Sequence, residues 1–134
     1  MKSQEQIAIS LAFKYHAGQT RRGGVPYINH LLQVAEQVEP QDDDARAIAW
    51  LHDILEDTEC SCGDLLDAGV TPGNVHAVEA LTHAAHQSYM EYIQNIPVNL
   101  RDIKIADMVS NLADDPSPRQ IEKYIKALQY FAGC

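Results

Sequence analysis

The chain has 134 residues, a formal net charge of −9 at pH 7, and hydrophobic and charged fractions of 46% and 22%. These values predict a single globular domain with a sizeable core over residues 1–134. The acidic balance argues against nucleic acid duplexes and anionic membranes as partners, because both are bound through basic surfaces. A small phosphorylated ligand is compatible with this charge, since a few local cations or a metal suffice to bind it.

Helical periodicity recurs along the whole chain. Ser3 and Gln6 have the spacing of a capping box, and a glycine-rich loop with two arginines, GQTRRGGVPY, follows the first helix at residues 18–27. No alternating strand pattern and no internal repeat occurs, so we predict an all-α domain, one helical bundle. The predicted helices lie near residues 4–17, 28–38, 41–57, 62–68, 71–83, 88–96, 99–115 and 117–132.

Cellular location is predicted from targeting signals and cysteine usage. Residues 1–18 lack a basic start followed by an apolar block, and no apolar run reaches membrane-spanning length. Cys60 and Cys62 form C-x-C, and together with Cys134 they do not complete a zinc knuckle. We therefore expect a cytoplasmic protein whose cysteines are free thiols.

The run LHDILED, residues 51–57, concentrates charge within an apolar helical framework. On one continuous helix, His52 and Glu56 are i,i+4 neighbours, as are Asp53 and Asp57, so the four side chains share a bounded arc. Carboxylates this close repel one another unless a cation or a proton lies between them. We interpret the run as part of a divalent metal site.

Two residues elsewhere in the chain would complete the ligand set. His30 stands at the start of a predicted helix, and Asp107 lies on an otherwise apolar helix face. With His52 and Asp53 they provide two imidazoles and two carboxylates, a set that suits manganese, iron, cobalt or zinc better than calcium. Four protein ligands leave positions for water or substrate, as a catalytic metal requires. Taken singly, each residue has an ordinary structural interpretation, such as a buried acid held by Lys104.

Three ordered motifs, TRRGGVPYINH, WLHDILEDT and IKIADMVSNLAD, together resemble the HD-domain hydrolases of the RelA/SpoT type. The chain is most similar to the small stand-alone alarmone hydrolases, over nearly its whole length from about Ala12. This resemblance implies a single HD hydrolase domain, a helical bundle with one Mn²⁺ ion, although other divalent transition metals could serve. It implies hydrolysis of the 3′-pyrophosphate of ppGpp or pppGpp, which gives GDP or GTP and pyrophosphate.

The same resemblance implies roles for ten residues. The metal ligands would be His30, His52, Asp53 and Asp107, and the acids that activate water would be Glu56 and Asp57. The substrate-binding positions would be Arg21, Arg22, Lys104 and Asn111. Two departures from the family pattern stand out: Leu31 replaces a common proline, and Ala113 with Asp114 replaces a more basic or hydroxylic continuation. The second departure leaves the preferred nucleoside open.

Two other functional classes compete with this interpretation. Another HD phosphohydrolase, acting on NADPH, ppApp or a deoxynucleotide, would keep the His-Asp metal set. A non-catalytic alarmone-binding module would more naturally have lost a ligand or an acid. The remaining histidines and several tyrosines are interpreted as surface, capping, core or rim groups: His16, His76, His83, His86, Tyr89, Tyr92 and Tyr124. Oligomeric state is not predictable from the sequence.

Overall fold

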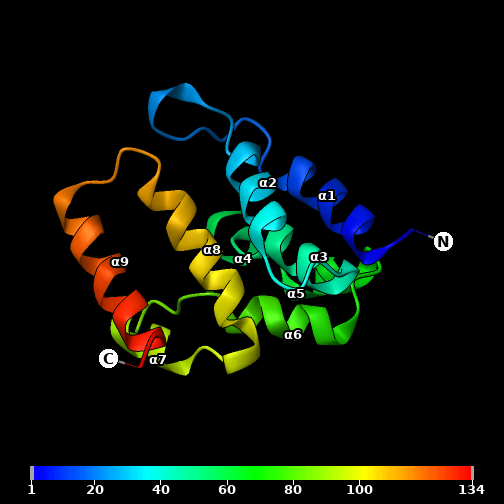
Figure 1. Ribbon diagram of the computed structural model, residues 1–134. Helices are drawn as coiled ribbons and strands as arrows, with labels where there is room; N and C mark the ends of the chain where they lie inside the picture. The colour runs from blue at the N-terminus through cyan, green and yellow to red at the C-terminus, as the bar shows by residue number, and fades with distance from the viewer. Residues whose placement is uncertain (1, 134) are drawn as a thin grey trace.

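Helices make up the architecture (Figure 1), as the periodicity predicts. The computed structural model describes residues 2–133, apart from the side chain of Arg22. Within this part of the chain there is no β-strand, only an isolated bridge between Thr20 and Pro26. The helices are α1 (Gln4–Tyr15), η1 (Arg22–Gly24), α2 (Ile28–Gln37), α3 (Asp43–Leu51), α4 (Ile54–Asp57), α5 (Cys62–Asp67), α6 (Pro72–Ala80), α7 (Tyr89–Asn95), η2 (Val98–Leu100), α8 (Arg101–Leu112) and α9 (Pro118–Phe131). The all-α prediction is confirmed.

Local capping explains where most of these helices begin. Ser3 and Gln6 form the predicted capping box, in which each side chain accepts a hydrogen bond from the other residue's backbone N–H. Pro72 and Pro118 occupy the first turns of α6 and α9, where a missing N–H costs nothing. A side-chain N-cap such as that of Ser3 stabilises a helix by about 1 kcal/mol. Side-chain caps are provided by Ser3, Asp42, Ser61, Thr71, Ser88 and Ser117.

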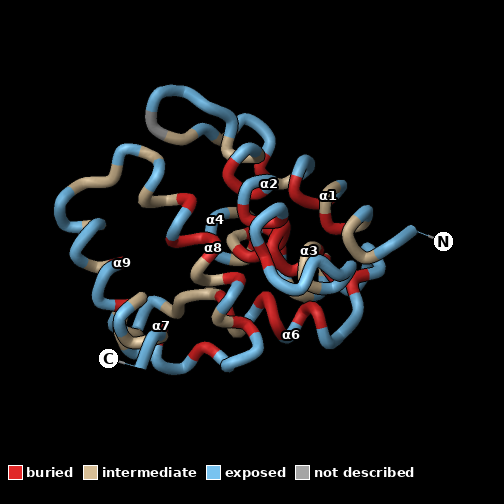
Figure 2. Tube along the Cα trace, in the orientation of Figure 1, coloured by how far each residue is buried: buried red, intermediate tan, exposed pale blue. Residues whose placement is uncertain are grey.

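The core forms around α3, which packs against α1, α2, α6 and α8. Figure 2 shows buried residues concentrated where these helices meet. On the other side of α8, α9 packs against both α8 and α7 (Figure 1). None of the helices in the described part of the chain has the length and apolar character needed to cross a bilayer. The largest fully buried apolar side chains are Leu31, Leu51, Ile54, Leu65, Ile93 and Met108.

The segment from residue 41 to 57 is not one continuous helix, which corrects the prediction drawn from its periodicity. α3 and α4 are separated by a turn at His52 and Asp53. Adjacent residues on an unbroken α-helix point about 100° apart. At this turn the two side chains converge instead, with Nε2 of His52 3.1 Å from a carboxylate oxygen of Asp53. Asp57 still follows Asp53 by one helical turn, since its N–H donates to the Asp53 carbonyl at 2.9 Å.

Candidate metal centre and adjoining pocket

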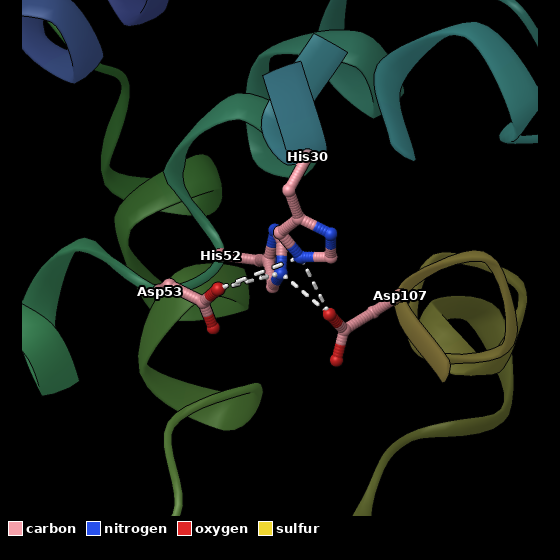
Figure 3. A group of neighbouring side chains, drawn as sticks. All are labelled: His30, His52, Asp53 and Asp107. Carbon is pink, nitrogen blue, oxygen red and sulfur yellow. Dashed lines mark hydrogen bonds and ion pairs between the residues drawn. The ribbon is translucent and has the colours of Figure 1, made fainter. Parts of the chain in front are cut away.

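Four side chains from three parts of the chain meet at one point (Figure 3). His30 comes from the first turn of α2, His52 and Asp53 from the turn between α3 and α4, and Asp107 from the middle of α8. One nitrogen or oxygen atom of each lies within 4.8 Å of those of the others. Both imidazoles and Asp107 are buried. The structure thus brings together all four residues that the sequence singles out as metal ligands.

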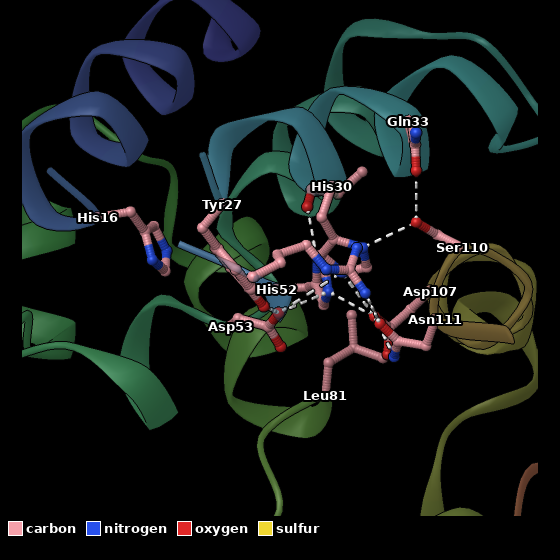
Figure 4. Close-up of polar contacts among 12 residues, drawn as sticks. His16, Tyr27, His30, Gln33, His52, Asp53, Leu81, Asp107, Ser110 and Asn111 are labelled. Carbon is pink, nitrogen blue, oxygen red and sulfur yellow. Dashed lines mark hydrogen bonds and ion pairs between the residues drawn. The ribbon is translucent and has the colours of Figure 1, made fainter. Parts of the chain in front are cut away.

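A hydrogen-bond relay orients the imidazole of His30 (Figure 4). The hydroxyl of Ser110 donates to Oε1 of Gln33 at 2.7 Å and therefore accepts from Nδ1–H of His30 at 2.9 Å. In neutral His30 the proton is thereby held on Nδ1, and the Nε2 lone pair faces Asp107, 2.9 Å away. Hydrogen bonds of this kind hold metal-binding histidines in the tautomer that coordinates the ion.

His52 is held in the same tautomer by the backbone. Its Nδ1 lies 2.6 Å from the carbonyl oxygen of Ala49. A carbonyl oxygen only accepts, so Nδ1 carries the hydrogen. Nε2 is then directed to carboxylate oxygens of Asp53 and Asp107, each 3.1 Å away. Both histidines therefore present Nε2 to the same small volume.

The centre of the cluster attracts positive charge, because two carboxylates and two imidazole Nε2 atoms are directed into it. Burial alone lowers the pKa of His52, but the carboxylates of Asp53 and Asp107 raise it well above its usual value. Burial alone raises the pKa of Asp107, yet Lys104 and His52 hold it well below its usual range. Two imidazole nitrogens and two carboxylate oxygens suit a divalent transition metal. The four residues therefore form a possible divalent metal site.

A pocket of about 220 Å³ adjoins the metal-site residues. Asp53 and Asp107 line it, together with Glu56 and Asp57, the predicted catalytic acids. Oε1 of Glu56 accepts a hydrogen bond of 2.8 Å from the backbone N–H of His83, which fixes this carboxylate and leaves its second oxygen available. Burial and the charges of Asp53 and Glu56 raise the pKa of Asp57 to about 6. Near neutral pH, Asp57 can therefore hold a proton that Asp residues ordinarily release.

A second hollow, of about 200 Å³, lies next to the pocket and shares lining residues with it. Arg21 lines this hollow, and its guanidinium forms an ion pair of 2.8 Å with Asp114 and donates a hydrogen bond of 2.8 Å to Oδ1 of Asn111. Asp114 is one of the departures from the family pattern, and it neutralises part of the Arg21 charge. The shared lining residues are Tyr27, Asn111 and Tyr124.

The predicted substrate-binding residues are distributed over the two cavities. Arg21 lies in the hollow, Asn111 in both cavities, and Lys104 in the pocket, 2.8 Å from Asp107. The loop before α2 positions Arg21 through Gly23 and Gly24, which both have a φ of +81°, a conformation that side chains other than glycine rarely adopt. The side chain of Arg22 lies outside the described residues.

Aromatic residues of the pocket are incompletely predicted by the sequence. Tyr89, Tyr92 and Tyr124 all line the pocket, although Tyr92 and Tyr124 are also buried, as expected of core residues. His83 is a pocket residue rather than a plain surface group, and its ring stacks on Tyr92 at 4.9 Å between centroids. Lys123 also lines the pocket, and it belongs to none of the three sequence motifs. The tyrosines and Lys123 lie on α7 and α9, whose periodicity cannot distinguish a pocket wall from a core, and His83 lies in the loop between α6 and α7.

His16 and Tyr27 support the metal-site residues from the side of α1. His16 is the C-cap residue of α1, as one of its two interpretations expects, but it is buried rather than on the surface, and its Nδ1 lies 2.8 Å from Oε1 of Gln19. Its ring lies 5.1 Å from that of Tyr27, whose hydroxyl donates a hydrogen bond to Asp53 (Figure 4). Tyr27 also lines the pocket, so it both contacts a candidate ligand and forms a wall.

Cys60 and Cys62 are free thiols, as predicted, and Cys134 lies outside the described residues. Burial raises the pKa of the Cys60 thiol, which disfavours the reactive thiolate.

A probable guanosine-3′,5′-bis(diphosphate) 3′-pyrophosphohydrolase of Synechocystis sp. is 30% identical over 101 residues, which cover 74% of the chain and 13% of that protein. A provisionally assigned chloroplastic GTP diphosphokinase, RSH1, of Oryza sativa subsp. japonica is 43% identical over 54 residues, 39% of the chain and 6% of that protein. The chain thus spans only a small part of either relative. No protein-family model matches the chain.

Among solved structures, the chain is similar to a protein described as a metazoan orthologue of SpoT that hydrolyses ppGpp and plays a role in starvation responses. The TM-score is 0.79 with 22% sequence identity, and the match covers 98% of this chain and 84% of the other. At this identity the match shows a shared fold.

Proposed function

We propose that this chain, a RelA/SpoT-type HD domain by sequence similarity and fold, hydrolyses the 3′-pyrophosphate of ppGpp or pppGpp, releasing pyrophosphate and GDP or GTP. The proposal rests mainly on a cluster of four possible metal ligands that lies directly beside a pocket with two further acids. Four convergent metal-binding groups adjoin a pocket that also holds two carboxylates, Glu56 and Asp57. A non-catalytic binding module would have no need for both carboxylates beside a complete ligand set.

His30, His52, Asp53 and Asp107 would hold one divalent ion, which supplies Lewis-acid chemistry by offsetting phosphate charge and lowering the pKa of water. We propose Mn²⁺, because mixed imidazole and carboxylate sites suit it, and related divalent transition metals share this preference. The hydrogen bonds of Ser110 to His30 and of the Ala49 carbonyl to His52 support this assignment, since they leave both Nε2 atoms free to coordinate.

Glu56 and Asp57 would divide the proton transfers of the reaction. The oxygen of a water molecule bonds to the phosphorus attached to the 3′ oxygen, and Glu56 accepts the proton that this water releases. The bond between that phosphorus and the 3′ oxygen breaks, its electron pair stays on the 3′ oxygen, and Asp57 donates the proton that completes the hydroxyl. Burial is the largest cause of the raised pKa of Asp57 and does not depend on the charge of Asp53, so it supports the acid role.

Arg21, Arg22, Lys104 and Asn111 are proposed to position the nucleotide. Lys104 would offset phosphate charge close to the metal site. Arg21 is held at both ends of its guanidinium by Asp114 and Asn111, so we assign it an orienting or stacking role rather than a source of net charge.

The decisive experiment is hydrolysis of a nucleotide panel by metal-stripped protein with and without added Mn²⁺. The panel contains ppGpp, pppGpp, ppApp, NADPH and 5′-monophosphates, and the products are identified by ion-exchange chromatography. We expect pyrophosphate and an intact 5′-phosphorylated nucleotide from ppGpp or pppGpp, only with metal. Products cleaved solely at the 5′ position, or no cleavage of either alarmone, would refute the proposal. Cleavage of NADPH or ppApp alone would instead favour the alternative nucleotide substrates.

A further inference from the structure

The part of the pocket lining that comes from α7 and α9 carries a buried hydroxyl without a partner. The hydroxyl oxygen of Tyr89 is inaccessible to solvent and has no hydrogen-bond partner among the described residues. Tyrosine hydroxyls at buried positions normally find one, because an unmade hydrogen bond leaves the group's desolvation uncompensated. Tyr89 lines the pocket. A small rotation of the Tyr89 ring toward the pocket would bring this hydroxyl to a ligand that accepts a hydrogen bond, and that bond would satisfy the group.

A cation without a carboxylate partner lies beside this hydroxyl. Lys123 lines the pocket, and its ammonium group lies 4.4 Å from the ring centroid of Tyr89 and 5.1 Å from that of Tyr124. Within the described part of the chain no carboxylate lies within 4.0 Å of the Lys123 ammonium, whereas Lys104 pairs with Asp107 and Lys126 with Glu122. Lys123 is therefore a free positive charge in the pocket of a protein with a net charge of −9.

Ring contacts hold this group of side chains together. The rings of Tyr89 and Tyr124 meet edge to face at 6.4 Å, and His83 stacks on Tyr92 at 4.9 Å. Edge-to-face and stacked aromatic pairs restrict the rings to few orientations. Lys123 thus lies on an aromatic surface that places its ammonium group before any ligand binds.

The ammonium groups of Lys104 and Lys123 both line the pocket and favour a negatively charged ligand there. Burial and the nearby Lys104 lower the pKa of Lys123, and the more weakly acting carboxylates of Asp107 and Glu56 offset only part of this. An anion between the two ammonium groups would relieve the repulsion between them. Because four carboxylates also line the pocket, a phosphate-bearing ligand needs cations to offset their repulsion, and Lys104 already serves Asp107.

We propose that Lys123 and Tyr89 bind the pyrophosphate group that the hydrolysis releases, with Lys123 as a phosphate-binding cation and Tyr89 as a hydrogen-bond donor. This inference rests on the proposed function, since it assigns a place to that substrate's 3′-pyrophosphate. Both residues lie outside the three motifs that carry the family resemblance, and they add polar contacts from α7 and α9 to the predicted metal ligands and catalytic acids, which lie on α2, α4, α8 and the turn between α3 and α4.

The test compares variants of the Mn²⁺-loaded protein in two measurements. Inorganic pyrophosphate binding is measured by calorimetry, and kcat and KM are measured separately with ppGpp. Lys123→Met should weaken pyrophosphate binding about 10- to 100-fold, the range for losing a hydrogen bond to a charged group. KM should rise similarly while kcat changes little, as expected when binding common to substrate and transition state is lost. Tyr89→Phe should weaken pyrophosphate binding about 2- to 10-fold.

Matched variants keep the inference falsifiable. Lys126→Met removes the same charge from an exposed position of α9 paired with Glu122, and it should leave both measurements unchanged. Lys123→Arg should restore most of the pyrophosphate affinity. Wild-type pyrophosphate affinity in Lys123→Met, or an equal loss in Lys126→Met, would overturn the inference. If ppGpp is not hydrolysed although pyrophosphate binding depends on Lys123, the proposed function fails while the anion site stands. If ppGpp is hydrolysed but Lys123→Met binds pyrophosphate normally, the proposed function stands and the anion site fails.

Discussion

Replacing Ser110 with alanine should weaken metal binding without touching a ligand. Its hydroxyl accepts the Nδ1–H of His30 and donates to Gln33, and both Ser110 and His30 are buried, at 3% and 1% exposure. Gln33 is exposed, so water can satisfy its amide oxygen after the change. The Nδ1–H of His30 has no such access. One buried donor is therefore left unsatisfied, at a cost of about 1–3 kcal/mol in the metal-free fold.

The same change releases His30 from the tautomer that directs Nε2 to the metal. Loss of such an outer hydrogen bond typically reduces metal affinity about 10- to 100-fold. The assay is competitive titration of Mn²⁺ into metal-stripped protein, together with denaturant unfolding. Gln33→Ala is the control, since Ser110 keeps its acceptor role and affinity should change little. Unchanged metal affinity in a correctly folded Ser110→Ala protein would refute the reasoning that Ser110 holds the ligand in place.

Three further predictions concern the candidate metal ligands and acids. His52→Ala should lose metal and activity together, as measured by elemental analysis and the ppGpp assay. Glu56→Gln should keep its metal and bind substrate, yet lose about 10²- to 10⁴-fold in single-turnover rate, because it removes only the proton acceptor. Near wild-type turnover, or loss of metal, would disprove that role. For Asp57, burial and neighbouring acids raise the folded pKa from 3.8 to about 6. The folded state then binds the proton more tightly than the unfolded state, so the stabilisation from this proton is present below pH 4 and is lost as pH rises through about 6. Asp57→Asn should therefore match wild type near pH 4 and be more stable above pH 6 in metal-free protein, as thermal unfolding across this range will test; equal melting temperatures at pH 8 would contradict it.

The elements and their starts could be predicted from the sequence because they depend on neighbours along the chain. Periodic apolar residues, the Ser3–Gln6 capping box, and Pro118 at the start of α9 act within a few residues of one another. The candidate metal ligands could also be predicted from the sequence, because they lie in three ordered motifs. The break in the helix at His52 and Asp53 could not be predicted, since the local pattern of residues 41–57 is compatible with a continuous helix.

Only the tertiary structure decided how distant residues complete the site. His30 and Asp107 are 77 positions apart, and the tautomer of His30 depends on Ser110, which is 80 positions away. The pocket residues from α7 and α9 were hidden for a related reason. Helical periodicity identifies a face that is buried, but not what it is buried against. Whether Tyr89 and Lys123 face a core or a cavity depends on how α7, α8 and α9 pack, and that packing sums many weak contacts between segments far apart in the chain.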